Sequence, residues 1–177
     1  MIESELSRPI KSRALPAEPV VIEASADERV AMAKRFSLTS VDDLHATVEL
    51  EQRAKAIHAN GTLKASITQA CAISHEDFST KIEEQLAFRF VKASAVEPGE
   101  DDEIEIELDA EELDEIEYSG DTFDLGEAVA QSLGLAIDPY AEGPNADAVR
   151  AEKGITSDED AEPSGPLAEA LKALKKN

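Results

Sequence analysis

The sequence contains no tryptophan, one cysteine and few aromatic residues. The single thiol, Cys71, cannot form an internal disulfide, and an aromatic content of 4% argues against a platform on which bases or sugars stack. No apolar run reaches the roughly 18 residues of a membrane-spanning helix. Residues 1–13 lack the apolar core of a secretory signal, which together with the lone thiol predicts a cytoplasmic protein without a membrane partner.

Basic residues are also scarce, and one third of the chain lacks them altogether. The 177 residues include 39 Asp and Glu but only 17 Lys and Arg, a formal charge of −22. Residues 1–92 are almost balanced, with 12 basic and 14 acidic side chains, whereas residues 93–149 have 19 acidic side chains and no Lys or Arg. Such a segment repels polyanions and favours basic partners.

Apolar periodicity predicts a single α+β domain over residues 1–140. A β-branched run predicts a strand at 20–23, and alternation predicts strands around 44–50, 63–71 and 78–90. Asn60-Gly61 is typical of a hairpin turn between two of them. We therefore expect an antiparallel sheet of five or six strands that could curl toward a barrel.

Capping signals predict two helices that pack on this sheet, with a third near the C-terminus. Ser25 and Glu28 have the spacing of a capping box before a helix at 26–35, and Asp124 precedes an apolar stripe that should end near Asp138-Pro139. The third, at 166–176, would be a short amphipathic helix.

The remaining segments are expected to be less regular. Residues 97–117 are an acidic segment in which a strand could run from Ile104 to Leu108, because apolar and acidic residues alternate there. Residues 141–165 combine Gly, Pro, Ala and acids without a period, which predicts a flexible linker and a flexible C-terminal tail.

No motif of catalysis or cofactor binding is present. The sequence lacks Gly-x-Ser-x-Gly and a glycine-rich phosphate loop. Cys71 and His75 have the spacing of two zinc ligands, but a closed site needs four. The acids from Asp101 to Asp109 lack the glycine and closing glutamate of a calcium loop. We predict a non-enzymatic protein with no catalytic residue, cofactor, metal or small-molecule substrate.

Four segments, taken in order, resemble a known family. They are Gln69 to Phe78, Asp124 to Val129, Leu135 to Tyr140 and Gly165 to Lys175. Their order and spacing resemble the YceD family of large ribosomal RNA subunit accumulation proteins. The residues that define its motifs here are Gln69, Cys71, Phe78, Asp124, Leu125, Asp138 and Pro139.

One departure from the family concerns a metal. The resemblance implies that many relatives carry a Cys-x-x-Cys near Cys71 and a second cysteine pair after the second helix. Here Ser74 follows Cys71 by three residues, and Tyr140 to Ala148 contains no cysteine. We therefore expect this chain to be metal-free, and one equivalent of zinc in purified protein would contradict that expectation.

The resemblance implies a role in the accumulation of 23S ribosomal RNA and the assembly of the large subunit. Combined with the charge map, it predicts an acidic adaptor for a basic ribosomal or assembly protein, with ribosomal RNA contacted indirectly. The partner-binding residues predicted for this role are Glu103, Glu105, Glu107, Asp109, Leu167, Leu171 and Leu174.

The alternative is direct RNA binding through basic residues near the two ends, with the acidic segment as an autoinhibitory RNA mimic. Those basic residues are Arg8, Lys11, Arg13, Lys34, Arg35, Lys172, Lys175 and Lys176.

Overall fold

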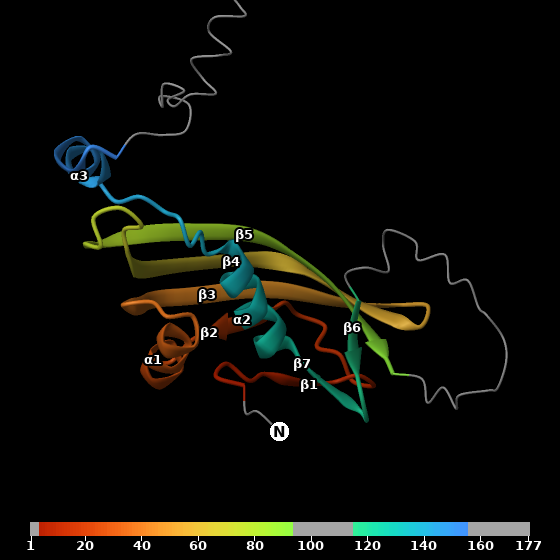
Figure 1. Ribbon diagram of the computed structural model, residues 1–177. Coiled ribbons are helices and arrows are strands. Elements are labelled where there is room, and N and C mark those ends of the chain that lie inside the picture. Colours follow the sequence, from red (N-terminus) through yellow and green to blue (C-terminus); the bar gives the residue numbers. More distant parts are fainter. Residues whose placement is uncertain (1–3, 94–114, 156–177) are drawn as a thin grey trace, which may run out of the picture.

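A five-stranded sheet with helices on one face forms the body of the protein (Figure 1). The computed structural model describes residues 4–93 and 115–155. Its strands follow one another in space as β2 (Val20–Glu23), β3 (Ser40–Arg53), β4 (Ala56–Ala70), β5 (Asp77–Lys92) and β6 (Glu115–Tyr118). Neighbours from β2 to β5 are antiparallel, whereas β6 runs parallel to β5. The α+β class is thus confirmed, but the sheet is mixed.

The sheet is open, so the expected curl into a barrel is wrong. Its outer strands, β2 and β6, are each four residues long and do not pair with each other. The two remaining strands, β1 (Pro9–Lys11) and β7 (Thr122–Asp124), pair in a separate antiparallel ribbon. This ribbon brings the N-terminal segment beside the start of α2 (Leu125–Ala136).

The hairpin expected at Asn60-Gly61 is also wrong, because both residues lie inside β4. β3 and β4 instead turn at Ala54-Lys55, where Ala54 adopts a φ of 51°. Gly61 lies opposite Val48, and a Cβ on it would be 2.1 Å from the Thr47 carbonyl oxygen. The glycine is therefore required for close approach of two strands and not for a turn.

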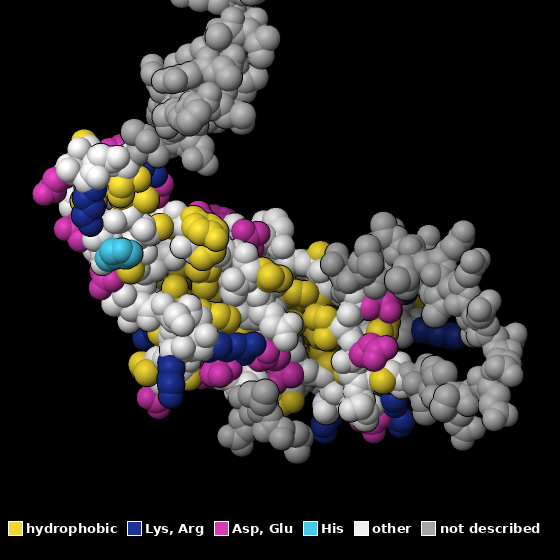
Figure 2. All heavy atoms as spheres, viewed as in Figure 1, with side chains coloured by type: hydrophobic (Ala, Val, Ile, Leu, Met, Phe, Trp, Pro, Cys, Tyr) yellow, Lys and Arg dark blue, Asp and Glu magenta, His cyan; other side chains and the backbone are white. Residues whose placement is uncertain are grey.

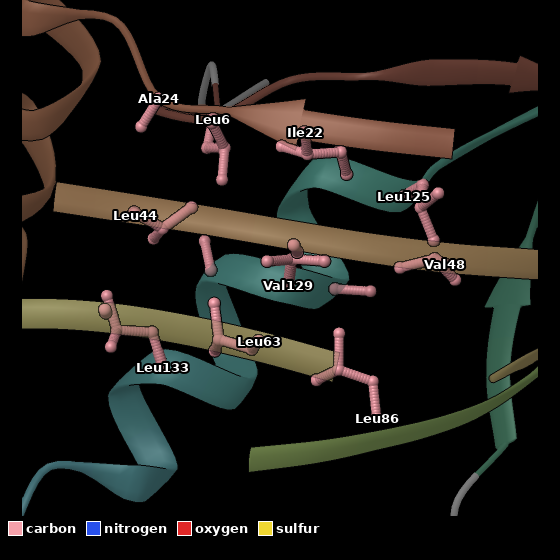
Figure 3. Close-up of a cluster of buried hydrophobic side chains, with 14 of the residues drawn as sticks. Leu6, Ile22, Ala24, Leu44, Val48, Leu63, Leu86, Leu125, Val129 and Leu133 are labelled. Carbon is pink, nitrogen blue, oxygen red and sulfur yellow. The ribbon is translucent and has the colours of Figure 1, made fainter. Parts of the chain in front are cut away.

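The two expected helices form where the capping signals place them. In α1 (Ala26–Arg35) the Ser25 hydroxyl accepts the Glu28 N–H, and the Glu28 carboxylate accepts the Ser25 N–H. Helix α2 lies across the sheet, and Figure 3 shows Leu63 and Leu86 of the sheet beside Val129 and Leu133 of the helix. The opposite face of the sheet is polar, the arrangement of a sheet with one covered side.

A third helix, α3 (Ala146–Lys153), forms within the segment expected to be a flexible linker. Its sequence has no long apolar stripe, but Arg150 pairs with Glu142 and Asp147, and Gly154 ends the helix at a φ of 63°. The flexibility of residues 141–165 and the helix at 166–176 stay predictions, because residues 156–177 lie outside the described part. The acidic strand at 104–108 also lies outside it.

Candidate functional site

The family-motif residue Cys71 forms the centre of a tight turn between β4 and β5. It is fully buried, and its Sγ accepts the N–H groups of Ile73 at 3.4 Å and Ser74 at 3.3 Å. Cys71 N–H donates to the Glu76 carbonyl at 2.9 Å, and His75 N–H donates to the Cys71 carbonyl at 3.0 Å. Hydrogen bonds from Ser74, with smaller contributions from Gly143 and Ile73, lower the pKa of the Cys71 thiol to about 7.

The segment after α2 packs against this turn. Ala72 N–H donates to the Ala141 carbonyl at 3.0 Å, and the Asn145 amide donates to the Glu76 carboxylate at 2.7 Å. A Cβ on Gly143 would lie 3.1 Å from the Phe78 ring and 3.4 Å from the Cys71 Cβ, so a larger residue would crowd both. The structure therefore brings residues 141–145, which directly follow the motif at 135–140, against the motif at 69–78.

These residues do not fit the metal that the family resemblance implies. The positions that would complete a four-ligand site lie close to Cys71, but they hold Ser74 and the cysteine-free segment 140–148. Across 4–93 and 115–155, no three His, Cys, Asp or Glu side chains form a cluster that could hold a metal. One thiol is too few for a structural zinc site, which uses four ligands. The expectation of a metal-free protein stays a prediction.

The motif Asp124-Leu125 fastens the N-terminal segment to α2. Asp124 Oδ1 accepts three backbone N–H groups, from Arg8 at 2.7 Å, Gly126 at 3.0 Å and Glu127 at 3.2 Å. The Ser7 hydroxyl donates to its other oxygen at 2.6 Å. One carboxylate thus caps α2 and holds the segment before β1, while Leu125 is fully buried in the core. The role that the geometry supports for this motif is structural.

Two ion-pair clusters reinforce the same junction. Arg8 contacts both Glu28 oxygens, at 2.6 and 3.1 Å, and Arg35 contacts both Glu127 oxygens, at 3.0 and 2.7 Å. Each arginine lowers the pKa of its carboxyl partner to about 2. Glu5 adds a second acid to Arg35 at 2.8 Å.

A groove runs along β5, between that strand and the stretch from α2 to Ala141. Its largest part, with a volume of about 500 Å³, is lined by Phe88 and Ile116 on one side and Leu135 on the other. A second part shares Gln85 and Leu135 with it. A third part shares Glu84 and Ala136 with the second and extends to Asp138. We call this the β5 groove; Figure 2 shows hydrophobic side chains exposed between α2 and β6.

The end of the β5 groove beside Asp138 contains one buried polar atom without a partner in the described ranges, the Thr80 hydroxyl. Gln69 lines this end and is 7% exposed. Buried polar groups are normally hydrogen-bonded, so this end of the groove stands out.

The β5 groove could not be predicted from the sequence, because it depends on how α2 crosses the sheet. Residues that it shares with the sequence-based expectations are Gln69 and Asp138. The predicted partner-binding residues lie outside the described part, and their role stays a prediction; these are Glu103, Glu105, Glu107, Asp109, Leu167, Leu171 and Leu174.

Comparison with known proteins gives one result. A family model, described as large ribosomal RNA subunit accumulation protein YceD, matches residues 59–175. No curated protein and no solved structure matches the chain. No helix within residues 4–93 and 115–155 combines the length and the apolar content needed to cross a membrane. The match spans well over half of the sequence and includes both motifs at the Cys71 turn, so the chain belongs to the YceD family.

Proposed function

We propose that this protein is a non-enzymatic factor for 23S ribosomal RNA accumulation and large-subunit assembly that acts as an acidic adaptor for a basic protein. The family description supplies the role in ribosomal RNA accumulation. The observation that carries the adaptor mechanism is the charge distribution, with 19 acidic side chains and no Lys or Arg in residues 93–149. A surface of this kind attracts basic proteins and speeds their association.

The structure gives the alternative, direct RNA binding, less support. Direct RNA binding needs basic residues that are already paired with acids. Arg8 forms an ion pair with Glu28, and Arg35 forms ion pairs with Glu127 and Glu5. Arg13 lies 3.6 Å from Asp121. Contact of these arginines with phosphate would require replacing their carboxylate partners, which lowers the electrostatic gain.

The test is affinity capture from cells with the full-length chain and two matched variants. One variant neutralises the predicted surface, by Glu103→Gln, Glu105→Gln, Glu107→Gln and Asp109→Asn. The control neutralises four exposed acids elsewhere, by Glu18→Gln, Asp43→Asn, Glu49→Gln and Glu152→Gln. Bound proteins and bound RNA are identified separately.

We expect the wild-type and control chains to capture a basic ribosomal or assembly protein at low salt, and the first variant to lose most of it. Capture should also fall steeply toward about 0.5 M salt, because screening weakens contacts between exposed charges. Equal capture by all three chains would contradict the adaptor mechanism. Recovery of 23S RNA without a basic protein would favour direct RNA binding instead.

A further inference from the structure

Over most of its length, the outer edge of β5 has no neighbouring strand among residues 4–93 and 115–155. β6 pairs with β5 only from Arg89 to Lys92. Toward the other end, the segment after α2 crosses near Phe78, where it makes no backbone hydrogen bond to β5. From Lys81 to Phe88, no described strand pairs with this edge. Eight residues of strand extend over about 27 Å.

The inner face beside this edge is only partly covered. Ile82 and Leu86 point to the inner face and are buried. Glu84 lies between them, opposite the buried Leu63, yet it is exposed. Leu135, which lines the groove, is 88% exposed. An added strand would place side chains of one face in the β5 groove, next to Leu135 and Glu84.

The charges that line the β5 groove indicate which kind of strand could bind there. Glu84 and Asp138 line the groove and form no ion pair in the described part of the chain. Lys81 is the one basic side chain among the groove residues, while Glu83 and Glu115 are held by Lys64 and Arg89. A second copy of this chain would bring like charges together at the edge, so self-pairing is disfavoured.

We propose that the edge of β5 from Lys81 to Phe88, together with the β5 groove, binds an extended basic segment of the partner protein by strand addition. In this mode, main-chain hydrogen bonds provide affinity and side-chain pockets provide specificity. Glu84 and Asp138 attract basic side chains, and the surface of Phe88, Ile116 and Leu135 receives an apolar one. Gln69 and Thr80 line the end of the groove beside Asp138, where the Thr80 hydroxyl has no partner in the described ranges. The inference rests on the adaptor function proposed above and specifies its binding site.

The probe is a synthetic peptide of about eight residues in which Lys and Val alternate, matched in length to the open edge. Three control peptides accompany it: one with Glu in place of Lys, one with the same residues scrambled, and one with every backbone nitrogen methylated. The methylated peptide keeps its charge but cannot donate hydrogen bonds to a neighbouring strand. Binding to the full chain is followed by anisotropy and by the backbone NMR signals of all its residues.

We expect the Lys-Val peptide to shift the signals of residues 81–88 and to slow their amide exchange. The methylated and Glu peptides should bind at least about tenfold more weakly. Glu84→Arg and Leu135→Asp should each weaken binding about tenfold. Their controls, Glu49→Arg and Val30→Asp, change an exposed acid and an exposed apolar residue away from the groove and should bind as wild type.

Equal binding of the methylated peptide, or shifts confined to residues 94–114 or 156–177, would overturn the strand-addition site. The adaptor function fails separately, when the wild-type chain captures no basic protein from cells. Capture that is intact in the wild type and unchanged by Glu84→Arg and Leu135→Asp would leave the adaptor standing and reject this site.

Discussion

At the scale of single residues, Asp124 performs two tasks with one carboxylate. It caps α2 through Gly126 and Glu127 and accepts the Arg8 N–H of the segment that precedes β1. Its place in a family motif therefore has a structural explanation. A side chain that satisfies backbone donors from two elements couples the folding of both.

We predict that Asp124→Ala lowers the free energy of unfolding by about 2 to 3 kcal/mol, since a lost cap costs about 1 and unpaired donors add to it. Asp124→Asn keeps one acceptor oxygen and should cost less. Urea unfolding monitored by circular dichroism measures both. A loss below about 0.5 kcal/mol for Asp124→Ala would show that the cap is not important.

Gly61 shows a limit of inference from sequence. Asn60-Gly61 is a dipeptide typical of turns, yet both residues lie inside β4. The apolar alternation of Leu63, Ala65 and Ile67 belongs to the same strand. The reason for the glycine is the Thr47 carbonyl oxygen, which lies only 2.1 Å from the place that a Cβ on Gly61 would occupy. A dipeptide cannot report a contact with a residue fourteen positions earlier in the chain.

Gly61→Ala should therefore destabilise the protein by more than about 2 kcal/mol, because the added methyl meets rigid backbone. Asn60→Ala is the matched control, since Asn60 is exposed within the same strand. Thermal unfolding of the two variants distinguishes a close strand contact from a turn. If Asn60→Ala were the more damaging change, the turn interpretation would be favoured.

At the scale of elements, the sequence predicts well where local signals are complete. Helix α1 has a full capping box, and its expected bounds agree with the structure. β1, β6 and β7 have three or four residues each and no alternation long enough to detect. They form because distant segments meet, which a single-chain pattern does not encode.

The candidate site could likewise be predicted only in part from the sequence. Gln69, Cys71 and Phe78 could be selected by their motif, but the return of Ala141 and Gly143 to the Cys71 turn could not. The β5 groove also depends on tertiary packing, because Ile82 and Leu86 are buried beneath neighbouring elements whereas Glu84 between them stays exposed.

The junction of the N-terminal segment with both helices should weaken in acid. The pKa values of Glu28 and Glu127 fall from 4.5 to about 2 on folding, so their contribution is present above about pH 4.5. It is lost as the pH falls toward 2, because protonation removes the partners of Arg8 and Arg35.

The matched variant is the double substitution Glu28→Gln and Glu127→Gln. We expect wild type to be more stable than this variant at pH 6, and the difference in urea midpoint to shrink by pH 3. Comparing the difference cancels the effect of the other acids, whose protonation relieves repulsion in both proteins. A difference that is the same at both pH values would contradict the assigned role of these carboxylates.

At the scale of the whole molecule, the charge of −22 is unevenly distributed. Several of the described arginines are held in internal ion pairs, as with Arg8, Arg35, Arg89 and Arg150. Residues 93–149 have 19 acidic side chains and no Lys or Arg, so the electric field of this segment is strongly negative. This asymmetry favours a basic protein partner over ribosomal RNA itself.

The most direct test of the adaptor function is the ratio of 23S to 16S ribosomal RNA in cells whose own copy of this protein is deleted. Three chains are supplied in turn: wild type, the variant neutralised at residues 103, 105, 107 and 109, and the variant neutralised at residues 18, 43, 49 and 152. Protein levels are matched by immunoblot.

We predict that wild type and the second variant restore the ratio, whereas the first variant leaves 23S RNA low. Full restoration by the first variant would contradict the claim that this acidic segment is the working surface of the protein.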